Sequence, residues 1–258
     1  MRATHVYVPL LIALIVVAGC HREREAYGRI RIEAFDTPPP SNVEHIYLTI
    51  TEVSVQSPES GWRTLVDTAI TYDFMQLING VTAVLCDTVL EPGYYTQMRL
   101  TVADTNEIVI NGVSYPLVVP SGVQTGVKIN LDFTVEPDEI IEILVDFDVS
   151  TSITWTPGNY LLRPAFRAFK KVLSGTVSGT VKDTAGMGIP NALVEAITAN
   201  TTTSTLTDSV GSYKLILLEG TYDIRASAEG YTTADTTYTE VEVHAGDNLT
   251  GYDFVLQP

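Results

Sequence analysis

Asp146 and Asp148 are the residues of this sequence whose spacing most suggests chemistry. They lie two apart in a segment that alternates apolar and polar residues, so on a β-strand both carboxylates leave the same face. Such a pair could ligate Ca²⁺ if carbonyl groups or a third carboxylate joined them. Across a cleft, it could instead supply the acid and base of a hydrolase.

A structural role is the main alternative for the same pair. Arg99, Lys128 or Arg163 would neutralise the two carboxylates on a solvated sheet face, or the carboxylates would cap the turn at residues 150–152. Arg99 and Lys128 lie on strands that can neighbour those of the two aspartates, so all four are candidate ligand-binding residues. We favour the structural role over Ca²⁺ binding, and Ca²⁺ binding over catalysis.

Aromatic rings near turns are the second feature that could bind a ligand, because an exposed ring can stack on a sugar. Tyr95, Trp155 and Tyr231 lie near turn signals, whereas strand alternation places Tyr94 and Tyr160 inward. Trp155 and Tyr231 are therefore further candidate ligand-binding residues.

The sequence lacks other patterns that carry chemistry. It has no His-x-x-x-His spacing for zinc and no Gly-x-Ser-x-Gly nucleophile motif. Cys86 lies in an apolar run and is expected to be a buried, inert thiol. We therefore predict no catalytic residue, no metal and no cofactor.

The amino-terminal segment is typical of an export signal. An apolar run of about a dozen residues is too short to span a bilayer, which takes about 20, and suits the core of a secretory signal. The run ends in Val17-Ala18-Gly19-Cys20, which resembles a bacterial lipobox. An ordinary cleaved signal, with Cys20 incidental, is the alternative.

The lipobox resemblance implies that residues 1–19 are a lipoprotein signal peptide, cleaved before Cys20. The Cys20 thiol would carry a diacylglycerol and the new amine an acyl chain such as palmitate, with residues 20–26 as a charged tether. His21 follows the cysteine where lipoproteins of the inner membrane typically carry Asp. The outer membrane is therefore favoured over the inner one.

Net charge limits the partners. The 258 residues include 15 Lys plus Arg and 31 Asp plus Glu, a formal net charge of −16. Nucleic acid is not expected as a partner, because no basic excess exists to neutralise phosphates. The expected partners are the lipid bilayer, through acylated Cys20, and an unknown envelope protein or glycan.

Period-two alternation of apolar residues dominates from Tyr27 onward, as in Ile30, Ile32 and Ala34. A change of phase after Ile50 predicts a β-bulge near residues 51–52. Frequent turn signals and one short helical turn at residues 73–78 complete the pattern. The fold class is therefore all-β, with two antiparallel β-sandwich domains in tandem at 27–170 and 174–258.

Residues 174–258 carry a set of turn and core motifs: Thr207-Asp208-Ser209-Val210-Gly211-Ser212-Tyr213, Gly220-Thr221-Tyr222 and Ala228-Glu229-Gly230-Tyr231. Together they resemble the carboxypeptidase regulatory-like domain, a transthyretin-type sandwich with a carbohydrate-binding-like fold. Asp208 and Gly211 are expected to shape a hairpin. No peptidase residues come with this resemblance.

Residues 27–168 resemble a second family. Its signposts are Pro92-Gly93-Tyr94-Tyr95-Thr96-Gln97-Met98-Arg99-Leu100, Val145-Asp146-Phe147-Asp148 and Leu162-Arg163-Pro164. They resemble the domain of unknown function numbered forty-three eighty-two, found in prokaryotic secreted lipoproteins. The resemblance implies export and supplies no chemistry.

These observations favour a non-enzymatic, membrane-anchored envelope lipoprotein that presents β-sandwich modules for protein or glycan binding. A carbohydrate-binding module acting through the carboxy-terminal domain is the second hypothesis. A calcium-dependent adhesin or a hydrolase using Asp146 and Asp148 is the third.

Overall fold

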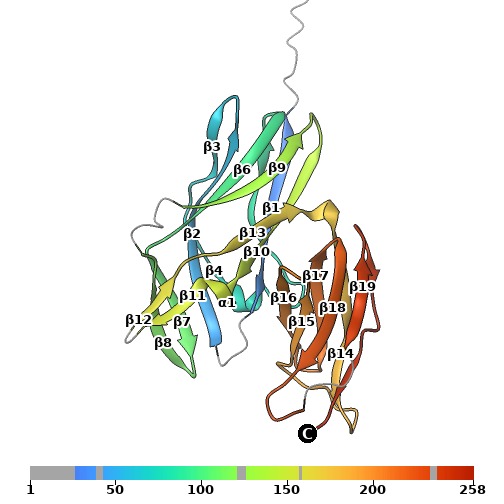
Figure 1. Cartoon of the computed structure of the whole chain (residues 1–258). Helices are drawn as coiled ribbons and strands as arrows, with labels where there is room; N and C mark the ends of the chain where they lie inside the picture. Colours follow the sequence, from blue (N-terminus) through green and yellow to red (C-terminus); the bar gives the residue numbers. More distant parts are fainter. Residues whose placement is uncertain (1–26, 39–42, 121–125, 157–158, 233–236) are drawn as a thin grey trace, which may run out of the picture.

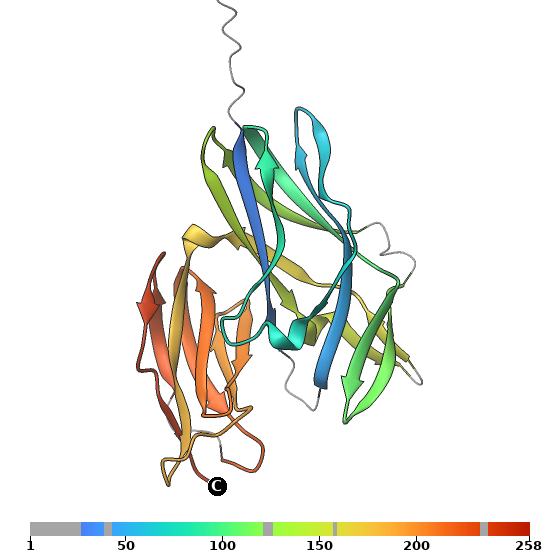
Figure 2. The ribbon, with the colours of Figure 1, turned by 180° about the vertical axis from the view of Figure 1, so that it is seen from behind.

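The computed structural model describes residues 27–38, 43–120, 126–156, 159–232 and 237–258. Within these ranges the chain is built almost wholly of β-strands in four sheets, which confirms the all-β prediction. Figures 1 and 2 show two domains side by side. The predicted signal peptide (1–19), Cys20 and the tether (20–26) lie outside the described residues, so their assignments stay predictions.

The N-terminal domain contains two sheets, one ordered β13-β10-β1-β5 and the other β11-β12-β8-β7-β2-β6-β9, with β3 and β4 also paired to β2. The elements are β1 (Gly28–Thr37), β2 (Val43–Ser57), β3 (Gly61–Val66), β4 (Ile70–Asp73), η1 (Phe74–Gln76), β5 (Ala83–Leu90), β6 (Gly93–Val102), β7 (Thr105–Ile110), β8 (Val113–Val118), β9 (Val127–Val135), β10 (Ile140–Asp148), α1 (Val149–Ser152), β11 (Ile153–Thr156), β12 (Asn159–Leu162) and β13 (Phe166–Lys170).

Its core lies between these sheets, and the alternation seen in the sequence fills it. Ile30, Ile32 and Ala34 are fully buried on the inner face of β1. Phe147 on β10 packs its ring 5.0 Å from Phe74. The short helix η1 therefore closes one end of the core, at the position where the sequence predicts a helical turn.

The C-terminal domain follows η3 (Lys171–Leu173) and is a smaller sandwich with its own core. One sheet is ordered β17-β14-β20, with β21 also paired to β14, and the other β16-β15-β18-β19. The strands are β14 (Ser174–Asp183), β15 (Leu193–Ile197), β16 (Thr202–Leu206), β17 (Ser212–Leu218), β18 (Gly220–Ser227), β19 (Tyr238–Val243), β20 (Asn248–Leu249) and β21 (Phe254–Leu256).

The sequence predicts antiparallel sheets, but some of the strand pairs in the structure are parallel. β1 pairs with β10, β12 with β8, and β14 with both β20 and β21, all in parallel. Parallel neighbours need long crossover connections. Period-two alternation marks a strand but does not reveal the direction of its neighbour.

The predicted bulge in β2 is confirmed, because the register with β6 shifts between Ile50 and Glu52. A second bulge overturns the assignment of Tyr94 and Tyr95. The register between β6 and β9 shifts between Tyr95 and Gln97, so counting by twos from Met98 fails. Tyr95 is buried with 3% exposure and Tyr94 is 50% exposed, the reverse of the prediction.

The turn around Asp208 and Gly211 also differs from the prediction. Asp208 accepts hydrogen bonds from the backbone N–H groups of Val210 and Ser212, and Gly211 has a φ of 80°. However, β16 pairs with β15 and β17 pairs with β14. The turn therefore carries the chain from one sheet to the other and does not close a hairpin.

Among the described residues, none of the helices has the length and apolar character required to traverse a bilayer.

Candidate functional site

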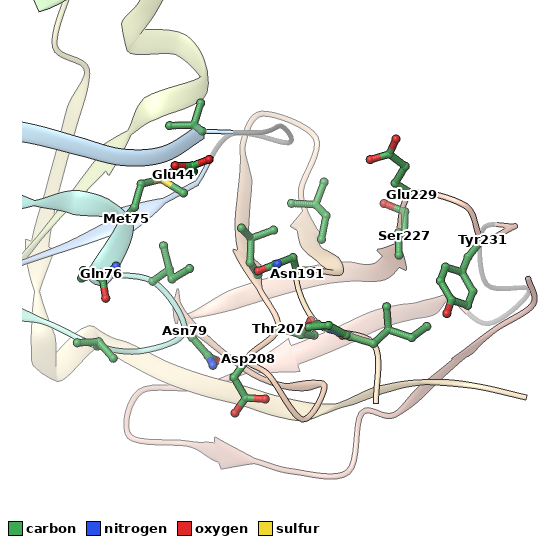
Figure 3. Close-up of a pocket in the computed structure, with 18 of the residues that line it drawn as sticks. Glu44, Met75, Gln76, Asn79, Asn191, Thr207, Asp208, Ser227, Glu229 and Tyr231 are labelled. Atoms are coloured by element: carbon green, nitrogen blue, oxygen red, sulfur yellow. The ribbon is translucent and has the colours of Figure 1, made fainter. Parts of the chain in front are cut away.

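A cleft of about 1390 Å³ opens between the two domains. Figure 3 shows Met75 and Gln76 from the N-terminal domain on one side, and Glu229 and Tyr231 from the C-terminal domain on the other. Binding sites are commonly found at domain interfaces of this kind.

The N-terminal wall is formed by η1 and the residues that follow it. Asp73 caps η1 by accepting a hydrogen bond from the backbone N–H of Met75. The cap sets the direction in which the chain leaves β4, so that Gln76 is exposed and Met75 is buried. Sequence reasoning predicted the helical turn but missed Gln76 as a site residue.

The C-terminal wall consists of loops at one end of the smaller sandwich. Ser227 is the last residue of β18, Glu229 and Tyr231 follow it in the next turn, and Asn191 comes from the turn before β15. Asn191 has a φ of 56°, a left-handed conformation that Asn tolerates better than most residues. Tyr231, predicted to be a ligand-binding residue, therefore lines the cleft.

Asn79 fastens the two domains together at the base of the cleft. Its backbone N–H donates to Thr205 Oγ1 at 2.8 Å, and its Nδ2 donates to the carbonyl of Ser212 at 3.4 Å. Its Oδ1 accepts from the backbone N–H of Lys214 at 2.5 Å. Asn79 thus bonds through its backbone to β16 and through its side chain to β17, the adjacent edge strands of the two C-terminal sheets.

Apolar and ionic contacts extend this junction. Leu206 of β16 is buried in the core cluster of the N-terminal domain. Arg167 on β13 forms an ion pair with Asp146 and donates a hydrogen bond to Thr203 Oγ1 at 3.4 Å. Ser204 Oγ donates to the carbonyl of Pro38 at 3.3 Å. The cleft walls are therefore held by contacts across most of β16.

Removing the Asn79 side chain should weaken this junction. In Asn79→Gly the backbone keeps its φ of 58° without strain, but the two side-chain hydrogen bonds are lost. We expect a loss of about 2 kcal/mol in the free energy of unfolding, measured by urea denaturation.

Asn191→Gly is the matched control for that variant. Asn191 has a similar left-handed backbone, and its exposed side chain has no hydrogen-bond partner among the described residues. We expect a change of only a few tenths of a kcal/mol. Equal losses in the two variants would show that Asn79 does not fasten the domains.

The predicted grouping of Asp146 with Arg99 and Lys128 is wrong. Asp146 belongs to the sheet β13-β10-β1-β5, whereas Arg99 and Lys128 belong to the other sheet. Asp146 is only 1% exposed, and it pairs with Arg167, which also bonds to Thr203 of the C-terminal domain. Burial raises the pKa of Asp146 by more than Arg167 lowers it, so that this pKa lies above its ordinary value.

Asp148 has a different structural role from Asp146. Its Oδ1 accepts from the backbone N–H of Thr151, which caps α1, the capping role that the sequence allowed. Among the described residues, no group of three or more His, Cys, Asp or Glu side chains is arranged to hold a metal ion. Within the part of the chain that the structure describes, no third carboxylate therefore joins Asp146 and Asp148 in an arrangement that could hold Ca²⁺.

Arg99 and Lys128 instead surround an indole ring on the outer face of their sheet. The guanidinium of Arg99 lies 4.6 Å from the centre of the Trp62 ring, and Lys128 Nζ lies 5.8 Å from it. Arg99 also donates to Glu52 Oε1 at 2.7 Å, which lowers the pKa of Glu52. These cations are engaged with neighbours and do not line the cleft.

Trp155 is 63% exposed on β11, directly across from Tyr160 on β12, and it does not line the cleft. Cys86 is 2% exposed, and burial raises its pKa to about 11, which keeps it a protonated thiol as predicted.

Comparisons with known proteins place both domains in families. The family described as "Domain of unknown function (DUF4382)" matches residues 27–164, and the "Carboxypeptidase regulatory-like domain" matches residues 176–257. No curated protein is a significant match.

Solved structures with some likeness include three proteins of different kinds. The Bacillus anthracis TIE protein has 14% identity and a TM-score of 0.28, over 90% of this chain and 34% of its own. Chlorocatechol 1,2-dioxygenase from Pseudomonas putida has 13% identity and a TM-score of 0.28, over 35% and 62%. The shaft pilin spaA from Lactobacillus rhamnosus GG has 9% identity and a TM-score of 0.27, over 90% and 98%.

At these TM-scores the likenesses support no statement about function, and the chain spans only about a third of the Bacillus anthracis protein. The family matches are specific and follow the same order along the chain as the resemblances in the sequence. The first of them covers more than half of the 258 residues. The chain therefore belongs to the DUF4382 family, and it carries a carboxypeptidase regulatory-like domain after its DUF4382 domain.

Proposed function

We propose that this protein is an exported, lipid-anchored binding protein of the cell envelope, and that its interdomain cleft binds a glycan. The lipid is attached at Cys20, and the outer membrane is the favoured location. The two domains would act as one recognition unit at the end of a short charged tether.

The observation that carries the glycan proposal is the set of free polar side chains that line the cleft. Gln76 comes from one wall, and Asn191 and Glu229 come from the other. None of the three side chains has a hydrogen-bond partner among the described residues. Amide and carboxylate groups offer paired donors and acceptors, which suit the neighbouring hydroxyl groups of a sugar.

Tyr231 supplies the apolar part of the same site. Its ring packs against the core of the C-terminal domain and remains partly exposed to the cleft. A tyrosine supported in this way loses little conformational freedom on binding and offers a rigid face for stacking on a sugar ring.

Charge narrows the class of glycan further. The described residues that line the cleft include Glu44, Asp208 and Glu229 and no Lys or Arg. An anionic glycan would meet uncompensated carboxylates and lose solvation without gaining a partner. A neutral or amine-bearing saccharide is therefore the ligand class that we propose.

A catalytic role is not part of this proposal. No His or Cys is among the described lining residues. Glu44 and Asp208 already accept hydrogen bonds from backbone N–H groups, those of Gly112 and of Val210 and Ser212 respectively. These bonds support a structural role for both carboxylates.

Glycan-array binding by the full chain tests the proposal. We expect wild-type protein to bind neutral or amine-bearing saccharides, and Tyr231→Ala to bind them about tenfold more weakly, because it loses the stacking surface. Tyr94→Ala removes an exposed tyrosine outside the cleft and should bind like wild type.

Trp155→Ala distinguishes the cleft from the sheet edge. Loss of binding in Trp155→Ala, with Tyr231→Ala unaffected, would move the site to β11 and contradict the cleft proposal. Binding only to anionic glycans would contradict the proposed ligand class.

A further inference from the structure

Asp36 is a buried carboxyl at the junction of the two domains. It lies near the end of β1 and is 3% exposed, and neither carboxylate oxygen meets a partner at full hydrogen-bond geometry among the described residues. A buried, ionised and unpartnered carboxylate is strongly unfavourable, so the environment selects the neutral acid.

The charged groups around Asp36 reinforce this selection. Asp146 and Asp148 on β10 and Asp73 at the end of β4 lie near enough to disfavour a negative charge on Asp36, which itself pairs across the sheet with Phe147. Arg167 on β13 is already engaged by Asp146, and Lys214 on β17 is exposed where it lines the adjacent cavity. Burial, followed by Asp146 and Asp148, raises the pKa of Asp36 well above its ordinary value, and the backbone of Thr37 lowers it only in part.

The backbone around Asp36 supports the contacts that fasten the domains. The N–H of Asp36 donates to the carbonyl of Leu77 at 2.9 Å, two residues before Asn79. The next residue, Thr37, donates through Oγ1 to Asp146 at 3.1 Å, and Pro38 accepts the hydrogen bond from Ser204. The end of β1 therefore lies beside two groups of interdomain contacts, the hydrogen bonds of Asn79 and the hydrogen bond from Ser204 to Pro38.

A small cavity shows how tightly this place is closed. It measures about 10 Å³ and is lined by Phe35 and Asp36 on one side and by residues 203–205 and 214–216 on the other. A single water needs about that volume, so the cavity cannot hydrate a carboxylate while the domains stay in contact.

We propose that Asp36 is a proton-operated latch between the two domains. While its carboxyl is neutral, the end of β1 stays dry and the contacts through Asn79 and Ser204 hold. When the carboxyl ionises, it demands water, and the domain contact has to loosen to admit it.

The direction of the pH effect follows from the proton balance. In the closed state Asp36 holds its proton, and in an opened state it faces water and releases the proton above about pH 4. Opening therefore becomes more favourable as the pH rises from about 4 toward the pKa of the closed state. The latch is tight in acid, and it is independent of whether the cleft binds a glycan.

Amide hydrogen exchange of the full chain tests the latch. The reporters are the backbone N–H groups of Asn79 and Lys214, which donate across the junction. In wild type their protection factors, corrected for the intrinsic pH dependence of exchange, should fall by up to tenfold per pH unit above about pH 4. In Asp36→Asn, which cannot ionise, they should stay constant.

Asp132→Asn is the matched control, because Asp132 is exposed and bonds to Tyr94. Both residues belong to the N-terminal sheet that does not contain Asp36. It should keep the wild-type slope. Equal slopes in wild type and Asp36→Asn would overturn the latch. A rise in protection on adding Ca²⁺ to wild type, absent in Asp36→Asn, would overturn it too, since Asp36 would then be a cation ligand.

A second measurement needs no variant to fold. The infrared band of a protonated carboxylic acid should persist in folded wild-type protein at about pH 6 and disappear on unfolding, because an ordinary Asp is ionised there. Absence of that band in the folded protein would contradict the neutral carboxyl on which the latch depends.

Discussion

Arg167→Ala is expected to lower the free energy of unfolding by about 3–5 kcal/mol at pH 8, because it leaves Asp146 buried without its cation. The side chain of Asp146 is 2% exposed and that of Arg167 is 36% exposed, so water that enters the vacated space offsets only part of the loss. The hydrogen bond from Arg167 to Thr203 across the junction is lost as well. Urea denaturation is the measurement.

The same loss should shrink in acid. Burial already holds the pKa of Asp146 above its ordinary value, and removal of Arg167 raises it further. The folded variant can then protonate Asp146, so its stability deficit is smallest at low pH and grows as the pH rises. A deficit independent of pH would show that the lost contact is packing and not charge.

Arg225→Ala is the control for an exposed pair. Arg225 forms an ion pair with Glu195 at 2.8 Å, and the arginine side chain is 51% exposed. Exposed pairs contribute about 0.2–1 kcal/mol. Similar losses in Arg167→Ala and Arg225→Ala would contradict the proposal that Arg167 neutralises a buried carboxylate.

Cys20→Ala is expected to abolish lipid attachment completely. Each buried methylene contributes about 0.8 kcal/mol, so several acyl chains would hold the wild-type protein in the membrane almost permanently. We expect wild type to incorporate a palmitate label in cells and to stay in the membrane fraction at high salt. The variant should take up no label.

Cys86→Ala provides the matched cysteine control. Cys86 is buried and its thiol is protonated, so it is not available for acylation. The Cys86→Ala protein should take up the label as wild type does. Label that persists in Cys20→Ala and disappears in Cys86→Ala would contradict the proposed anchor.

Local patterns in the sequence were enough to predict the strands and the cores. Ile30, Ile32 and Ala34 alternate in the chain and are fully buried in the sheet. The phase change after Ile50 predicted the bulge correctly because apolar residues alternate clearly both before and after it. Hydrophobic alternation works here because each sheet buries one face.

The same reasoning failed where a bulge had no such mark. Both Tyr94 and Tyr95 fit an inward position, so nothing in the sequence showed that the register shifts after Tyr95. Counting by twos assigned the wrong tyrosine to the core. One extra residue reverses the face of every residue beyond it.

The cleft could not be predicted from the sequence, because it depends on how the two domains pack against each other. Asp146 alternates as an outward residue but is buried in the structure, beside Arg167, which bonds to Thr203 of the C-terminal domain. The bonds from Asn79 to Ser212 and Lys214 join positions more than 130 apart in the sequence, which no local pattern reveals. Tyr231 was predicted as a ligand-binding candidate because it is an aromatic residue beside a turn, and the structure places it in the lining of the cleft.

The most direct test of the account is hydrogen exchange of the full chain with and without the saccharide that binds best on the array. We predict slower exchange on both walls of the cleft, in residues 75–81 and 227–231, when the saccharide is bound. Slower exchange confined to one domain, or centred on residues 153–160, would contradict a binding site that the two domains build together.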